Sequence, residues 1–191
     1  MVSLRITAGR RPSCHTGPMT TTATSHLPSE LDRLADARAH YAALKARVTD
    51  GEPWTLAEAF GTEPEASWGP REVLAHVVEM LPFWLGELER VVDGDGVAPA
   101  PFGRAADDAL RIGVIERERS LPLRVLFARV DAGLWSWMER LPRLTDIERG
   151  KTGLHPRLGE MPAARIAERF VLGHAEEHLA QLQEILAAAG R

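Results

Sequence analysis

A pair of histidines on the apolar side of one predicted helix, residues 161–188, limits most strongly how this chain can fold. His174 and His178 are four residues apart, and at ~100° per residue Phe170 and Ile185 share their face. A buried imidazole needs either a hydrogen-bond partner or a metal ion. We therefore expect other elements to cover this face and to supply such partners.

Two histidines at this spacing are also half of a metal site. Their Cβ atoms lie ~5–6 Å apart, so one nitrogen of each ring can reach a single cation. The segment also matches H-x-x-E-H, the pattern of inverted zinc proteases, with Glu177 as the general base. Such proteases take a further carboxylate ligand well downstream, whereas the sequence ends at Arg191. We therefore expect the third ligand upstream of the pair.

His76 is the candidate for that third ligand. A second amphipathic helix is expected from Pro70 to about Val92, because the first turn of a helix tolerates proline. His76 lies in the middle of its apolar stripe, with Phe83 within ~20° of it. The pattern thus indicates an inward-facing histidine on a second helix.

Two interpretations of these histidines stay open. In the first, His76, His174 and His178 hold one divalent metal ion inside one end of a helical bundle, with an open fourth position. In the second, each is a core histidine whose ring hydrogen-bonds a neighbouring carboxylate. The same carboxylates could instead orient the rings of a metal site. The polar residues near the three histidines on their helices are Glu72, Glu79, Glu177 and Gln181, whose roles the spacing does not assign.

The cysteine content limits the metal and the compartment. Cys14 is the only cysteine, which excludes an intramolecular disulfide and a thiolate metal cage and fits a reducing cytoplasm. A site of histidines points to borderline metals, with zinc or nickel ahead of iron or manganese.

Composition excludes several other classes of protein. With 191 residues, 45% of them hydrophobic, the chain suits one globular domain. A formal charge of -4 disfavours binding to nucleic acid or to an anionic membrane surface. No apolar run approaches the ~18 residues that a membrane span needs.

The first 27 residues are expected to form a disordered tail before a helical domain at 28–191. Residues 1–26 are rich in Thr, Ser, Gly and Arg and contain no acidic residue or apolar periodicity. Met19 is an alternative start, and a transit peptide is the other interpretation of this composition.

Two more long helices follow from caps and periodicity. Ser29 and Asp32 predict a capped helix that ends near Asp50, and a third helix is expected after Pro122. The segment between the second and third helices, with a short charged helix at 104–119, makes a long crossover. No strand-like alternation is present, so the sequence predicts an all-α four-helix bundle.

The histidines outside these apolar stripes are expected at the surface. His40 lies off the stripe of the first helix, and His155 falls in a polar loop predicted at 142–159. We expect both to be solvated.

Two motifs resemble those of the DinB-like (DinB/YfiT) superfamily of small metal-binding four-helix bundles. Residues 68–76, WGPREVLAH, are similar to the opening of its second helix, and His174-x-x-x-His178-x-x-Gln181 is similar to its C-terminal motif. The resemblance spans most of residues 29–190. It implies a bundle with a long crossover, often dimeric, and a divalent metal ion held by His76, His174 and His178.

The resemblance also implies a range of functions. The superfamily includes S-transferases that use mycothiol or bacillithiol, a mycothiol-dependent maleylpyruvate isomerase, and members without a known role. The leading expectation is a metal-dependent transferase that adds a low-molecular-weight thiol to a small electrophile. The alternatives are a non-catalytic metal-binding or stress-response protein and a metal-dependent isomerase or hydrolase.

Overall fold

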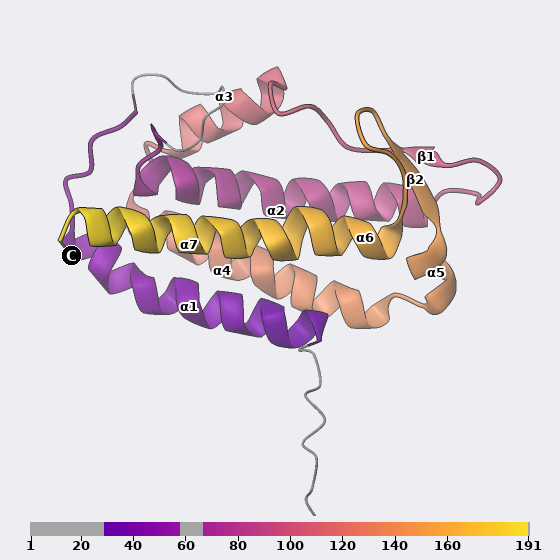
Figure 1. Cartoon of the computed structure of the whole chain (residues 1–191), viewed down its shortest axis with the longest axis horizontal. Helices are drawn as coiled ribbons and strands as arrows, with labels where there is room; N and C mark the ends of the chain where they lie inside the picture. Colours follow the sequence, from indigo (N-terminus) through magenta and orange to yellow (C-terminus); the bar gives the residue numbers. More distant parts are fainter. Residues whose placement is uncertain (1–28, 58–66, 191) are drawn as a thin grey trace, which may run out of the picture.

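The computed structural model describes residues 29–57 and 67–190. The expected disordered tail, with Cys14 and Met19, lies outside the described residues. Within them, four long helical rods lie side by side, and a small sheet closes one end (Figure 1).

The rods are α1 (Glu30–Asp50), α2 (Pro70–Val92), α4 (Leu123–Arg140) and a C-terminal rod made of α6, η3 and α7. α1 packs against α4 and α7, and α2 packs against α4 and against α6 and α7. α2 and α4 run in the same direction, so the chain must return along the bundle between them (Figure 1). This is the predicted four-helix bundle with a long crossover.

Local sequence signals place the helix ends. Ser29 and Asp32 form the expected capping box, with Asp32 N donating to Ser29 Oγ at 3.1 Å and Ser29 N donating to Asp32 Oδ2 at 3.0 Å. Pro70 is the first residue of α2, and Asp93 follows its last turn. The predicted bounds of these helices are confirmed.

The C-terminal rod differs from the single helix expected at 161–188. Met161 and Pro162 belong to a strand, and the helical part begins with α6 (Ala163–Ala167). A π-helical turn, η3 (Glu168–Leu172), then joins α6 to α7 (Gly173–Ala188). A π turn holds one more residue than an α turn and often marks a functional site.

The crossover contains β1 (Ala100–Pro101) and α3 (Ala109–Glu118), and α3 packs on α2. After α4 come the turn η2 (Leu141–Arg143), the short helix α5 (Asp146–Gly150) and a hairpin of β2 (Thr152–His155) and β3 (Gly159–Pro162). β1 pairs parallel to β2, and β2 pairs antiparallel to β3. The expectation of a polar loop without strands at 142–159 was wrong, because strands of two to four residues are too short for a visible alternation.

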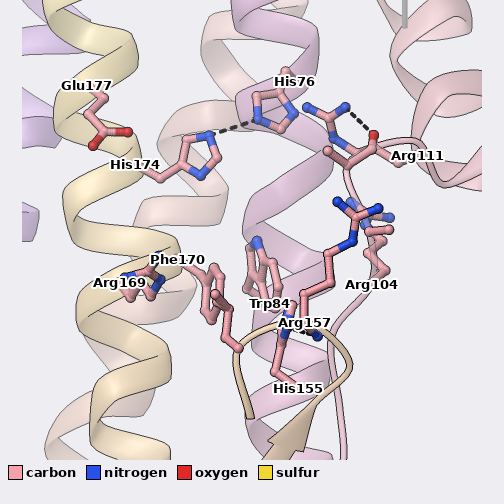
Figure 2. Close-up of a pocket in the computed structure, with 13 residues that line it drawn as sticks. His76, Trp84, Arg104, Arg111, His155, Arg157, Arg169, Phe170, His174 and Glu177 are labelled. Carbon is pink, nitrogen blue, oxygen red and sulfur yellow. Dashed lines mark hydrogen bonds between the residues drawn. The ribbon is translucent and has the colours of Figure 1, made fainter. Parts of the chain in front are cut away.

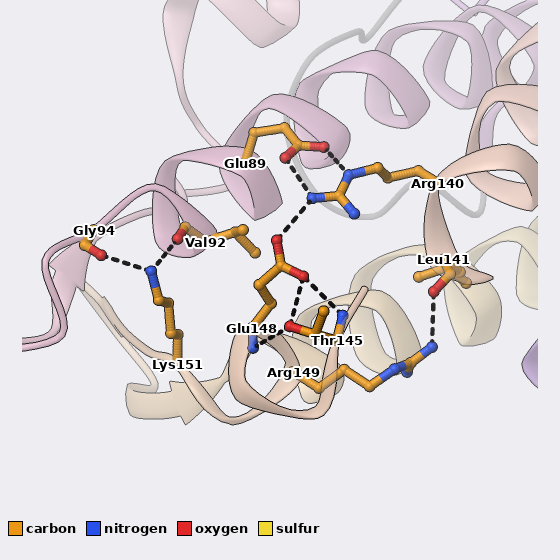
Figure 3. A network of polar contacts seen from close by, with 9 residues as sticks. All are labelled: Glu89, Val92, Gly94, Arg140, Leu141, Thr145, Glu148, Arg149 and Lys151. Atoms are coloured by element: carbon orange, nitrogen blue, oxygen red, sulfur yellow. Dashed lines mark hydrogen bonds and ion pairs between the residues drawn. The ribbon is translucent and has the colours of Figure 1, made fainter. Parts of the chain in front are cut away.

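A polar network stabilises the end of the molecule that carries the small sheet (Figure 3). Lys151 Nζ donates to the carbonyl oxygens of Val92 and Gly94, where α2 ends. Arg140 of α4 binds both carboxylate oxygens of Glu89 on α2. These contacts hold the start of β2 against the end of α2 and so position the hairpin over the bundle.

Candidate metal centre

The structure brings the three predicted histidines together inside the bundle. His76 comes from α2, and His174 and His178 come from the antiparallel α7. One nitrogen of each ring lies within 4.8 Å of the others. The Nε2 atoms of His76 and His174 are 3.1 Å apart, and both side chains are drawn in Figure 2. His76 and His178 are buried, whereas His174 is half-buried.

The arrangement of these rings fits a metal ion. Nitrogen ligands ~2.0–2.1 Å from a tetrahedral zinc lie roughly 3.3 Å from one another, close to the separation of His76 and His174. Burial, and then the neighbouring His178 and His174, holds the pKa of His76 well below its usual value. Burial, then His178 and Arg111, lowers the pKa of His174 to about 3. Both rings are therefore neutral at pH 7, which is the form that binds metal.

Two polar side chains adjoin the rings on their outer side. Gln181 Oε1 accepts a hydrogen bond from His178 Nδ1 at 2.8 Å, which leaves Nε2 as the nitrogen for a metal. Glu79 Oε2 lies 3.9 Å from His76 Nδ1. Burial raises the pKa of Glu79, although its ion pair with Arg104 opposes that effect.

Glu72 forms its hydrogen bonds with residues other than the histidines. Its Oε1 accepts hydrogen bonds from Ala57 N at 2.8 Å and from Arg119 Nη1 at 3.1 Å. Glu72 therefore joins α2 to the segment after α1 and to the end of the crossover. The idea that it orients His76 is not supported by these contacts.

The three-histidine group opens into a cavity of about 590 Å³ between α2, the crossover, the β2–β3 turn and the C-terminal rod (Figure 2). Two of the three histidines are in its wall. The lining consists of His76, Trp84, Arg104, Ala105, Ala106, Arg111, His155, Arg157, Leu158, Arg169, Phe170, His174 and Glu177. A metal bound by the histidines would thus face a space large enough for a small substrate.

His155 is a residue that the sequence analysis placed wrongly. It was expected to be solvated, but it is 6% exposed at the end of β2. Its ring stacks on Phe170 at 5.4 Å between centroids, and Phe170 stacks on Trp84 at 4.0 Å. The hairpin folds over the open end of the bundle and carries His155 into the wall of the cavity. His40, in contrast, is exposed on α1 as expected.

Four arginines of the cavity were not recognised from the sequence. Arg104 and Arg111 come from the crossover, Arg157 from the β2–β3 turn and Arg169 from η3. Burial, then Arg169 and Arg157, lowers the pKa of His155. The cavity therefore has a positive potential. No sequence motif predicts this potential, because the four arginines come from three separate segments.

The fold and this site define a class of protein: a four-helix bundle with three converging histidines at the base of a solvent-accessible cavity. No protein-family model matches the sequence, and no curated protein matches it. Among solved structures, the chain is similar in fold to YfiT from Bacillus subtilis, described as a probable metal-dependent hydrolase with an unusual four-helix bundle topology.

The two folds superpose with a TM-score of 0.58 at 14% sequence identity, over 86% of this chain and 91% of YfiT. This likeness shows the fold and confirms the expected four-helix bundle with a YfiT-like topology. Whether the three histidines bind a metal stays a prediction. No helix among the described residues is long and apolar enough to cross a membrane.

Proposed function

We propose that the chain is a metal-dependent enzyme in which His76, His174 and His178 hold one divalent ion, zinc or nickel by preference. The observation that carries the proposal is the position of the three histidines at a cavity of about 590 Å³. A metal with a structural role is normally closed off by a fourth protein ligand. Here the ligand set has three members among the described residues, and two of them reach the cavity wall.

The leading reaction is transfer of a low-molecular-weight thiol, such as mycothiol or bacillithiol, to an electrophile. A divalent metal at this site supplies nucleophile activation, because coordination lowers the pKa of a thiol or of water. The described residues contain no cysteine, so the thiol has to arrive with a substrate. The positive potential of Arg104 and Arg111 next to His76 favours an anionic sulfur in the cavity.

Other side chains around the site would orient the metal ligands and contact the substrate. Gln181 keeps the proton of His178 on Nδ1, and Glu79 lies beside the outer nitrogen of His76. The stacked rings of Trp84 and Phe170 give the substrate an apolar surface in the cavity wall. These groups orient the ligands and exclude water around the reacting atoms.

Hydrolysis is the second candidate, because Glu177 provides a carboxylate in the cavity wall. Its side chain is exposed, and it follows the ligand His174 by three residues. A carboxylate at this position could take a proton from an attacking water. The description of YfiT as a probable metal-dependent hydrolase is consistent with this candidate.

One experiment separates the candidates. The zinc-loaded protein is mixed with mycothiol or bacillithiol and monochlorobimane, and in parallel with 4-nitrophenyl acetate. Zinc-dependent loss of free thiol that is absent in His174→Ala supports the transferase. Zinc-dependent ester cleavage without thiol loss, reduced in Glu177→Gln, supports the hydrolase. A protein that retains zinc and is inactive in both assays, with each thiol, would point to the non-catalytic alternative.

A further inference from the structure

The cavity beside the three histidines is unusually rich in positive charge. Among the described residues that line it, four are arginines and Glu177 is the one acidic residue. The chain as a whole is acidic, with a formal charge of -4, so the positive charge of the cavity lining is opposite in sign to the net charge of the chain. A cavity lined by one sign of charge raises the local concentration of ions of the opposite sign.

The inner two arginines are held by the protein itself. Arg111 Nη1 donates to the carbonyl oxygen of Ala106 at 2.9 Å. Arg104 forms an ion pair with Glu79, and its Cζ lies 3.6 Å from the centroid of the Phe83 ring. Their positions are therefore set before a ligand arrives.

The outer two arginines are held by fewer contacts, and Arg169 Cζ lies 5.9 Å from the centroid of the Phe170 ring. Arg157 is exposed, and its ion-pair contact among the described residues is with Asp107 at 4.0 Å. Arg169 is exposed as well and forms no ion pair with any residue in the described ranges. Both guanidinium groups lower the pKa of His155, and Figure 2 shows Arg169 and Arg157 on opposite sides of Phe170.

A group of stacked aromatic rings lines the cavity next to these outer arginines. Trp84 and Phe170 stack with an interplanar angle of 11°, and His155 stacks on Phe170 at 14°. A planar group can extend such a stack by packing against an outer face or edge of its rings. The wall therefore presents an aromatic surface flanked by two guanidinium groups with free donors.

We propose that the substrate of this cavity is a small organic anion with a planar body, whose carboxylate or phosphate binds Arg157 or Arg169. Guanidinium groups bind such oxyanions through paired, charge-assisted hydrogen bonds. The planar body lies against the ring surface of Trp84, Phe170 and His155, and the inner arginines complement further negative charge near the histidines. This proposal defines the substrate class of the enzyme proposed above. It rests on that proposed function for the reaction near the three histidines.

The test is equilibrium binding, which is independent of turnover. Titration calorimetry of the zinc-loaded protein compares benzoate and phenyl phosphate with the neutral isostere benzamide. We expect at least one anion to bind ~10-fold more tightly than benzamide. The stronger of the two anions distinguishes a carboxylate from a phosphate substrate.

The matched variants are Arg157→Ala/Arg169→Ala and, as the control with the same loss of charge, Arg124→Ala/Arg143→Ala. All four positions are exposed, and Arg124 and Arg143 do not line the cavity. We expect the first variant to bind the preferred anion ~10-fold more weakly and the control to bind like the parent protein. Circular dichroism confirms that both variants are folded.

A repeat with the metal removed by a chelator separates arginine binding from direct ligation of the anion by zinc. The difference in anion affinity between the two double variants should persist in the metal-free protein. Equal binding of benzamide and both anions, equal affinities in the two variants, or an anion preference that disappears with the metal would overturn the proposal. Inactivity in the thiol and ester assays would refute the proposed function but leave these affinities unchanged, so the two failures are distinguishable.

Discussion

The side chain of Gln181 decides which nitrogen of His178 is available to a ligand. Its amide oxygen accepts the Nδ1 proton at 2.8 Å, so the lone pair lies on Nε2. Gln181 is three residues beyond His178, a spacing at which side chains on one helix meet. The role that the sequence left open for this residue is thus an orienting one.

The first prediction concerns His174. The purified protein should carry about one divalent metal ion per chain, and His174→Ala should lose most of it, because two imidazoles hold a metal much more weakly than three. His40→Ala is the matched control, since His40 is exposed on α1. Elemental analysis measures the metal content. Full retention by the His174 variant would refute the assignment of the site.

A second prediction concerns Gln181. Gln181→Leu should lower zinc affinity roughly 10-fold to 100-fold, as loss of a partner that orients a ligand typically does. Gln183→Leu on the same helix is exposed and should bind zinc like the parent protein. Competition with a chromophoric chelator measures both affinities. Equal affinities of the two variants would mean that the hydrogen bond to His178 does not orient the ring for the metal.

At the scale of elements, the crossover and the hairpin convert the end of a bundle into a cavity wall. The crossover carries Arg104 and Arg111, and the hairpin carries His155 and Arg157. Besides the pairing of β1 with β2, the two segments also meet at Gly103. A Cβ atom there would lie 2.3 Å from His155 Cδ2, and the backbone has a φ of +82°, which disfavours other residues.

Gly103→Ala should therefore destabilise the protein by roughly 1–3 kcal/mol, from backbone strain and from displacement of His155. Gly113→Ala in the middle of α3 is the contrasting variant, because nothing lies within 4 Å of its added Cβ. That variant should stabilise the protein by about 0.5–1 kcal/mol, since glycine is a poor helix former. Urea denaturation followed by circular dichroism measures both. A stable Gly103→Ala would mean that crossover and hairpin are not packed as described.

On the scale of the whole molecule, buried groups on different elements hold the bundle together. Tyr41 OH of α1 donates to the carbonyl oxygen of Ala175 on α7 at 2.9 Å. Trp137 Nε1 of α4 donates to the carbonyl oxygen of Leu81 on α2 at 2.9 Å. Burial raises the pKa of Tyr41, so its hydroxyl remains a donor. The bundle core is thereby joined along two different helix pairs.

Global stability should depend on pH through His155, whose pKa is lowered by burial and by Arg169 and Arg157. Its ring is protonated in the unfolded chain below about pH 6.5 and stays neutral in the folded chain down to a lower pH. Between these two pKa values the unfolded state binds more protons. The free energy of unfolding should therefore fall as the pH falls, by up to about 1.4 kcal/mol per pH unit for this group.

The measurement is urea denaturation of the metal-free protein at several pH values from about 6.5 downward. His155→Gln should show a shallower dependence on pH than the parent protein, while His76 and His174 contribute equally to both. His40→Gln, altered at an exposed position, should retain the parent slope. An unchanged slope in the His155 variant would contradict the burial of its neutral ring.

The sequence by itself determined the long helices, several of their ends and the inward direction of the three histidines. Helix period and caps are local properties, so Ser29, Pro70 and the i, i+4 spacing of His174 and His178 can be read without knowing the fold. The meeting of His76 with that pair could be predicted as well, because the apolar faces of two long helices must pack against each other.

Only the tertiary structure decided what surrounds the histidines. The strands of the hairpin are too short to show alternation, and the burial of His155 depends on docking against Phe170 and Trp84 rather than on its own neighbours in sequence. The cavity arginines are dispersed over residues 104–169 and become one charged surface when crossover, hairpin and η3 meet. Such a surface depends on contacts between distant segments, and local sequence patterns do not encode those contacts.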